Sequence, residues 1–216
     1  MTHSQQQPRE SGLDRALALA REQLAQRNPA EIARCAGTGY YPEGEQAGRF
    51  AFRFLGQPME VTFPDGQVTA PGAPKPPKGA VALLLLHYLL QADGCPMGER
   101  WIAFRELDGG FLYDQAFRGR LEPVLLREFA PHLERFEQAA RAMGASPLDF
   151  GDSAFAFEVL PRLHMAFIFY QGDDEFPPAV SALFDSAASH YLPTEDLAIL
   201  GGMLTGKLLA AAAACA

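Results

Sequence analysis

The pattern that most constrains this chain is a two-residue alternation of aromatic side chains with charged or small ones, present in two separate places. This period puts alternate side chains on opposite faces of a β-strand. Residues 49–54 and 59–63 alternate in this way on either side of a Gly56-Gln57 turn signal. Residues 154–159 and 165–170 alternate on either side of a turn at 160–163. The sequence therefore predicts two antiparallel hairpins.

Helical patterns account for much of the remaining sequence, and they do not follow a β-α-β rhythm. The chain is thus expected to be an α+β protein, a single domain with a largely antiparallel sheet built from two hairpin or meander units packed with about six helices. Further strands are predicted around Val68 and over 100–106. The predicted helices cover residues 13–28, 32–36, 79–91, 112–130, 131–143, 177–191 and the stretch from Thr194 to the end of the chain.

The domain organisation follows from two polar or proline-rich segments. Residues 1–11 are predicted to be a disordered tail, and 12–216 a single domain. The Pro-rich stretch 70–79 is interpreted as an extended connector within that domain, because the segment before it is too small to be stable alone.

Charge and composition narrow the classes of partner. The chain has 26 acidic residues against 18 basic ones, a formal charge of −8, which argues against nucleic-acid or anionic-membrane partners. Charged residues interrupt the apolar runs of the first thirty residues, so no secretory signal is expected and a cytoplasmic location is predicted. The apolar stretches at 80–90 and 197–216 are interpreted as helices of a soluble protein.

The cysteines Cys35, Cys95 and Cys215 are far apart and contain no C-x-x-C pair. They are interpreted as structural thiols, with Cys95 in a loop where it could be exposed. No iron–sulfur cluster or zinc ion of the chain's own is expected, because three separated thiols cannot supply a four-thiolate shell.

Arg105 is the most informative charged residue, since it shares a predicted strand face with Trp101. A guanidinium on such a face is either paired with a buried carboxylate or aimed at an anionic ligand. We expect it to be buried and paired, with Glu175 or Asp152 as partner. Its removal would then destabilise the protein by about 3 kcal/mol or more.

The densest acidic segment is Asp173-Asp174-Glu175, before the predicted helix at 177–191. It is interpreted either as a solvated loop whose acids favour a helix N-terminus or as part of a site. Thr194 is expected to cap the last helix, with Glu195 and Asp196 in its first turn. If the chain has a site, we expect it where the end of the Trp101 strand, the acidic loop and the Thr194 helix converge.

His87 belongs to an otherwise apolar helix, so its ring must find a hydrogen-bond partner. Phosphate-loop, dinucleotide-binding, serine-hydrolase and zinc-protease motifs are absent from the sequence, and no catalytic residue is assigned. The candidate ligand-binding residues are His87, Trp101, Arg105, Glu106, Asp152, Arg162, Asp173, Asp174, Glu175 and Glu195.

Several strings, taken in order, resemble one family. They are LLLLHYLLQADGCPMGERWIAFRELDGGFLY, then Gly151-Asp152, then LPRL, then QGDDEFPPAVSALFDSAASHYLPTEDLA. They resemble the uncharacterised family termed domain of unknown function 3786, found mainly in anaerobic bacteria and archaea. The resemblance implies no established activity. Some members are fused to a small iron–sulfur domain, whereas this chain has no such cysteine cluster.

The expected function is that of a ligand-binding or accessory module in anaerobic cofactor or redox metabolism. The expected partner is an iron–sulfur protein or a small-molecule ligand, and the cofactor and oligomeric state are left open. The alternative is an enzyme that acts on a small anionic substrate through Arg105 and the Asp173–Glu175 carboxylates.

Overall fold

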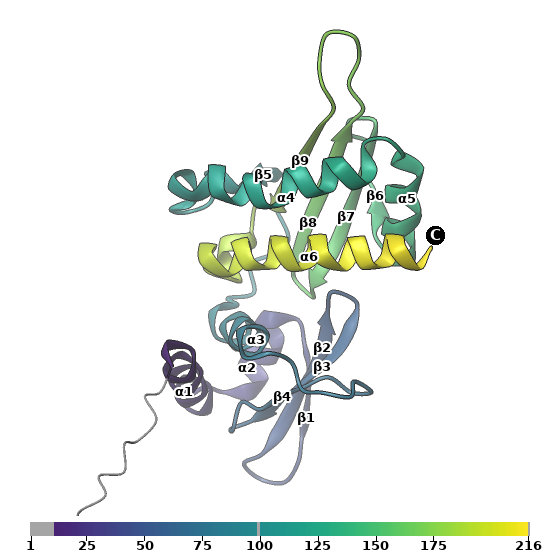
Figure 1. Ribbon diagram of the computed structural model, residues 1–216. Helices are drawn as coiled ribbons and strands as arrows, with labels where there is room; N and C mark the ends of the chain where they lie inside the picture. Colours follow the sequence, from purple (N-terminus) through teal and green to yellow (C-terminus); the bar gives the residue numbers. More distant parts are fainter. Residues whose placement is uncertain (1–10, 99, 216) are drawn as a thin grey trace, which may run out of the picture.

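The computed structural model describes residues 11–98 and 100–215, and it shows an α+β fold with two antiparallel sheets (Figure 1). The predicted class is confirmed, although the two hairpin units belong to separate sheets. The helices in the described part are α1 (Gly12–Ala25), α2 (Pro29–Ala36), α3 (Gly79–Gln91), α4 (Asp114–Phe129), α5 (Leu133–Ala142) and α6 (Thr194–Ala214). Short 3-10 turns are η1 (Phe104–Glu106), η2 (Gly110–Tyr113) and η3 (Ala188–His190).

The N-terminal half contains α1 to α3 and a four-stranded sheet in the order β1-β2-β3-β4. Its strands are β1 (Gly39–Pro42), β2 (Gly48–Phe54), β3 (Gln57–Phe63) and β4 (Val68–Thr69). The predicted first hairpin is confirmed, with Phe50 opposite Val61 and Phe52 opposite Met59. Strand β1 was not predicted, and its side chains are mostly exposed.

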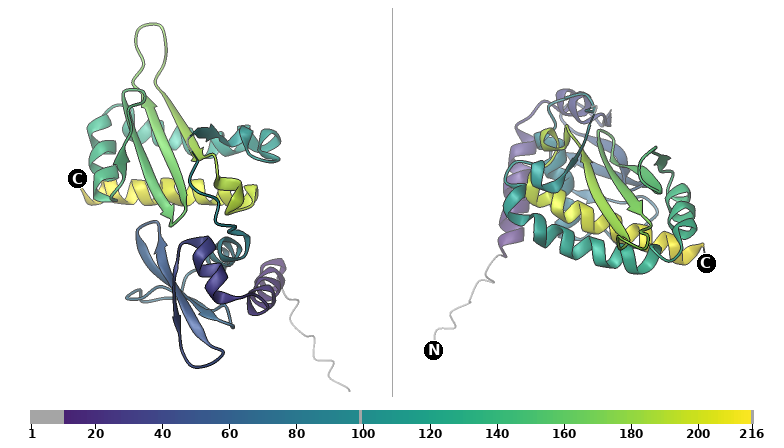
Figure 2. Two further views of the ribbon diagram at one scale, coloured as in Figure 1. Left: turned by 180° about the vertical axis from the view of Figure 1, so that it is seen from behind. Right: turned by 90° about the horizontal axis from the view of Figure 1, so that it is seen from above.

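The C-terminal half contains a five-stranded sheet in the order β5-β9-β8-β7-β6. One of its faces is covered by α4, α5 and α6 (Figures 1 and 2). The predicted second hairpin is confirmed, with Phe155 opposite Phe167. The strands are β5 (Trp101–Ala103), β6 (Ser146–Pro147), β7 (Ser153–Leu160), β8 (Leu163–Tyr170) and β9 (Ala179–Asp185).

The helix predicted over 177–191 is wrong, because this segment forms β9 and η3 instead. The three- and four-residue spacing of its apolar side chains resembled a helical face. In the structure β9 pairs along its length with β8, for example Val180 with Phe169, and this tertiary pairing overrides the local pattern.

Two other predicted elements differ in detail. The strand predicted over 100–106 ends at Ala103, where the chain turns into η1. Thr194 does not cap α6 from outside: it is the first residue of the helix, and its hydroxyl donates to the Asp108 carbonyl oxygen at 2.7 Å. Ser11 caps α1 in a capping box with Asp14, and the rest of the predicted tail lies outside the described residues.

The hydrophobic core is continuous between the two halves. One cluster of buried side chains includes residues of both sheets and of all six α-helices. The prediction of a single domain over 12–216 stays a prediction, for which one cooperative unfolding transition would be the check.

Tyr88 of α3 connects the halves through a buried hydroxyl group. This hydroxyl donates to the carbonyl oxygen of Ala36, at the end of α2, at 2.6 Å. It also accepts the backbone N–H of Arg162, in the β7–β8 turn, at 3.1 Å. The ring packs against Phe52 of β2 and Tyr191 after η3. Desolvation of the phenol raises the Tyr88 pKa well above its ordinary value, so the hydroxyl keeps its proton.

Of the helices in the described residues, α6 has the length and apolar composition that a membrane-spanning helix needs. The core helix of a soluble protein meets the same test, and α6 packs on α4 and α5. At Gly201 an added β-carbon would lie 2.7 Å from the ring of Phe117, so only glycine lets α6 approach α4 this closely.

Replacing Tyr88 by Phe is expected to lower the free energy of unfolding by about 1–3 kcal/mol, because the buried Ala36 carbonyl and Arg162 N–H lose their partner. Urea denaturation at neutral pH measures this. Tyr170→Phe, at an exposed tyrosine of β8, is the matched control and should leave the midpoint unchanged. Equal midpoints for the Tyr88 variant and wild type would contradict the bridging role.

Candidate ligand pocket

A pocket of about 580 Å³ lies beside the start of α6. Its walls come from η1 and the turn after it, from η2 and the first turns of α4, from the end of α3, and from the segment that joins η3 to α6. This volume lies in the range that small-molecule sites occupy in proteins. Of the three segments predicted to converge on a site, the end of the Trp101 strand and the start of the Thr194 helix both contribute residues to this pocket.

The floor of the pocket is aromatic. Phe104 and Phe117 are both buried and stack with ring centroids 4.3 Å apart and an interplanar angle of 14°. The turn above them is tight: an added β-carbon on Gly110 would lie 1.9 Å from the Phe104 carbonyl oxygen. Only glycine can occupy that position, and the close approach fixes where η2 begins relative to the floor.

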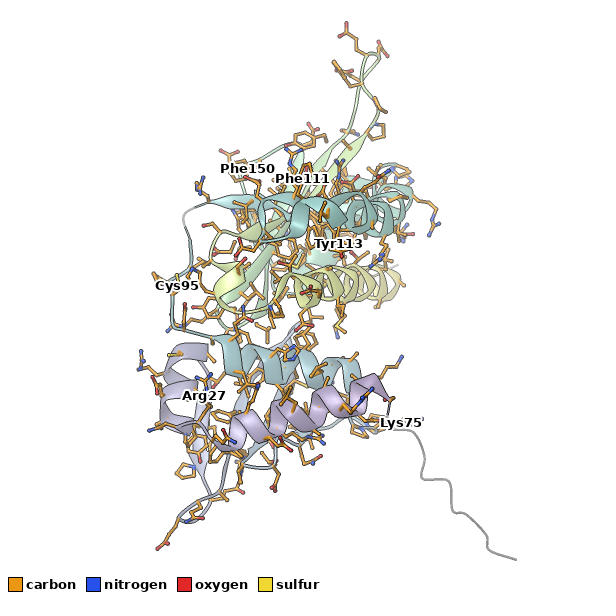
Figure 3. All side chains as sticks on the ribbon, turned by 90° about the vertical axis from the view of Figure 1, so that its left-hand side faces the viewer. Arg27, Lys75, Cys95, Phe111, Tyr113 and Phe150 are labelled. Atoms are coloured by element: carbon orange, nitrogen blue, oxygen red, sulfur yellow. The ribbon has the colours of Figure 1, made fainter. Side chains whose placement is uncertain are left out.

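The rim of the pocket carries exposed apolar side chains. Tyr113 and Ile199 line the pocket and are 62% and 44% exposed, and the neighbours Phe111 and Leu112 are 77% and 81% exposed. Figure 3 labels Phe111 and Tyr113 in the upper half of the molecule, at the level of α4. Four large apolar side chains at one place on a surface indicate a contact region for another molecule.

The polar side chains of the lining are those of Gln91, Asp108, Arg120, Ser189, Thr194 and Glu195, together with the Tyr113 hydroxyl. The Gln91 amide donates to the Ser189 carbonyl oxygen at 2.7 Å, which holds the end of α3 against η3. Arg120 takes part in none of the ion pairs between described residues. The pocket thus combines an apolar interior with one guanidinium and two carboxylates at its edge.

His87 finds its hydrogen-bond partner in Asp196, with 2.5 Å between Nδ1 and Oδ2. Asp196 is only 7% exposed and lies in the first turn of α6. The hydrogen bond to this carboxylate raises the pKa of His87, which desolvation lowers to a smaller extent. The need for a partner was predicted, and the structure identifies it. His87 does not line the pocket, although Gln91 one turn further along α3 does.

The prediction for Arg105 is wrong. Arg105 is exposed on η1, not buried on a strand, and none of the ion pairs between described residues includes it. The chain leaves the sheet after Ala103, so the strand face assumed for Arg105 does not extend that far. Arg105 lines a smaller pocket of about 180 Å³ beside the Arg118–Glu122 pair of α4.

The acidic residues Asp173, Asp174 and Glu175 lie in the β8–β9 connection, which projects from the end of the sheet (Figure 1). Neither the 580 Å³ pocket nor the one that contains Arg105 includes them. They do not precede a helix, so the helix-capping interpretation is also wrong. The Asp173 carboxylate accepts the backbone N–H groups of Glu175 and Phe176, each at 2.8 Å, and these bonds lower its pKa.

The other predicted candidates have local structural contacts. The Glu106 carboxylate accepts the Ala103 N–H at 2.7 Å, and the Asp152 carboxylate accepts the Gln171 N–H at 2.8 Å. Trp101 lies on the short edge strand β5, opposite Asp185. The Arg162 side chain packs over Gly37 at the end of α2. Of the ten predicted residues, only Glu195 lines the larger pocket.

Most of the pocket residues were not predicted, including Phe104, Asp108, Tyr113 and Arg120. The available signal was the Asp108-Gly109-Gly110 break followed directly by three large apolar residues. Such a run after a glycine turn was interpreted as the start of a helix. In the structure α4 begins only at Asp114, which leaves the apolar run in the exposed turn η2.

No group of three or more His, Cys, Asp and Glu side chains within 11–98 and 100–215 is arranged to hold a metal ion. Cys35 is buried, Cys95 is partly exposed in the connection between the two halves (Figure 3), and Cys215 is exposed. That the chain binds no iron–sulfur cluster or zinc of its own stays a prediction, which elemental analysis would check.

Replacing Arg105 by Ala is expected to change the free energy of unfolding by less than about 0.5 kcal/mol, because the side chain is exposed and unpaired among the described residues. Phe104→Ala, at the adjacent buried position, should cost about 3 kcal/mol or more. Denaturant midpoints compare the two. A large loss for the Arg105 variant would show that its guanidinium has a partner after all.

The His87–Asp196 pair should make stability depend on pH. Because the folded-state pKa of His87 lies above the unfolded value of 6.5, its contribution is fully present below pH 6.5 and is lost as pH rises through the folded pKa. Urea denaturation from pH 5.5 to 8.5 should show this decline in wild type and a flatter profile in Asp196→Asn. His132→Gln, in an exposed His–Glu pair at the N-terminus of α5, is the control. Parallel profiles for wild type and Asp196→Asn would contradict the assignment.

Comparison with known proteins gives one match. Residues 28–207 match the family model described as domain of unknown function (DUF3786). No curated protein and no solved structure matches the chain. The matched range includes every element from α2 to η3 and all of the residues that line the pocket. Since the match covers most of the sequence, this chain belongs to the DUF3786 family.

Proposed function

We propose that this chain is a small-molecule-binding protein whose ligand occupies the pocket beside the start of α6. The observation that carries the proposal is the pocket itself: about 580 Å³, with a stacked aromatic floor and exposed charged side chains in its lining. Proteins commonly bind small molecules in such a site, where an apolar interior supplies affinity and a few polar groups set orientation.

The lining indicates the chemistry of the ligand. Phe104, Phe117 and Tyr113 favour a flat apolar body, because such a group can pack against aromatic side chains over a large area. Arg120 at the edge can hold an acidic group, since its guanidinium offers paired donors. Asp108 and Glu195 add acceptors for hydroxyl or amino groups. The proposed ligand is therefore a ring-containing compound with at least one charged substituent.

The physiological role that we propose for such a protein is an accessory one in anaerobic cofactor or redox metabolism, in the cytoplasm. The resemblance to a family found mainly in anaerobes supports this role. A partner that is itself an iron–sulfur protein would fit the same setting. The alternative of an enzyme that combines Arg105 with the Asp173–Glu175 carboxylates has less support, because these groups line no common pocket.

A fluorescent aromatic sulfonate, 8-anilinonaphthalene-1-sulfonate, serves as the probe because it combines flat rings with a permanent negative charge. We expect saturable binding to wild type. Ala198→Trp should weaken binding by about tenfold or more, because the indole fills the pocket that Ala198 lines. Arg120→Gln should weaken it through loss of the cation.

The matched control is Ala210→Trp, at an exposed position of the same helix. It should leave probe binding unchanged. Circular dichroism and denaturant midpoints confirm that the variants fold. Either no saturable binding to wild type or equal affinity for the two tryptophan variants would contradict the proposal.

A further inference from the structure

We infer that the His87–Asp196 contact positions the wall of the pocket formed by the start of α6, so that ligand affinity depends on whether His87 carries a proton. This inference rests on the proposed function, since it concerns the regulation of the same pocket. His87 is a positioning residue here and does not touch the ligand.

Two polar side chains of α3, one helical turn apart, hold the segment that leads into α6. His87 contacts the Asp196 carboxylate at 2.5 Å, and the Gln91 amide donates to the Ser189 carbonyl oxygen at 2.7 Å. Residues at i and i+4 lie on the same face of a helix. That face of α3 therefore holds both ends of the segment 189–196, which forms one wall of the pocket.

Asp196 is well placed to transmit a change at His87 to the pocket. It is 7% exposed, and among the described residues the His87 ring is the one side chain that forms a hydrogen bond or ion pair with its carboxylate. Its neighbours Thr194 and Glu195 line the pocket in the same helical turn. The His87 contact therefore holds the same helical turn that carries two pocket residues.

Among the described residues, Asp196 is the one charged side chain that forms a hydrogen bond or ion pair with the His87 ring. Asp196 faces it from α6, with Glu195 beside it in the same turn. The other helices packed on α3 are α1 and α2, and none of their described charged side chains forms a hydrogen bond or ion pair with the ring. A second pair, His190 with Asp93 at 2.6 Å, lies next to Ser189 but is exposed on both sides.

Loss of the His87 proton has a defined consequence. With the proton, a buried carboxylate faces a cation through a charge-assisted hydrogen bond. Without it, the largely desolvated carboxylate lacks a charged partner, which favours its movement toward solvent. The first turn of α6 moves with it, and the pocket wall loses its position. The raised pKa of His87 is consistent with this coupling.

The test measures affinity for the same anilinonaphthalene sulfonate from pH 5.5 to 8.5, a range in which the sulfonate does not titrate. We expect wild-type affinity to fall by about fivefold or more as pH rises. His87→Gln, which keeps a donor but cannot titrate, and Asp196→Asn should both give nearly flat profiles. A histidine side-chain NMR titration should place the His87 midpoint above 6.5 in wild type and lower in Asp196→Asn.

Two control variants separate this pair from other histidines. His132→Gln, in a distant exposed pair, and His190→Gln, in the exposed pair next to Ser189, should both keep the pH dependence of wild type. A flat wild-type profile, or one that persists in His87→Gln, would overturn the inference while leaving the pocket proposal intact. Absence of saturable binding at every pH would contradict the proposed function itself.

Discussion

The buried hydroxyl of Tyr88 is the interaction on which the arrangement of this molecule depends. Helix α3 is apolar around most of its circumference and is packed on several sides, so any polar group that it buries must find a partner. The Tyr88 hydroxyl satisfies this requirement by donating to the end of α2 and accepting from the β7–β8 turn. One phenol thus fixes the positions of elements from both halves.

The same helix also organises the pocket. Its Tyr88 side lies toward the interior, whereas His87 and Gln91 reach the segment that leads into α6. The stacked Phe104–Phe117 pair supplies the opposite, apolar part of the site from η1 and α4. Stability and the candidate site therefore share one scaffold. A substitution in α3 therefore affects the core if it alters Tyr88, and the pocket if it alters His87 or Gln91.

The sequence predicted the parts of the fold whose patterns are local. Both hairpins were found because aromatic alternation is specific to half-buried strands, and the long helices because their apolar spacing is regular. β9 could not be found in this way: its apolar residues also fit a helical face, and pairing with β8 decides the outcome. The short edge strands β1 and β6 lack a buried alternation and gave no signal.

The site was harder to predict than the fold, because it depends on where the chain leaves regular structure. Arg105 would face inward if its strand continued, but the chain turns after Ala103. The acidic loop appeared prominent because its charges are adjacent in sequence, yet the hairpin carries it away from the pocket. By contrast, the chemistry of His87 required a partner whatever the fold. Only tertiary structure could show that this partner is Asp196.

Short edge strands limit how copies of this protein can pair through their sheets in solution. The five-stranded sheet ends on β5 and β6, with three and two residues, and the four-stranded sheet has a two-residue strand, β4, at one edge. Such edges offer few unpaired backbone groups to a second chain. Growth of either sheet into an intermolecular ribbon is thereby disfavoured at these edges.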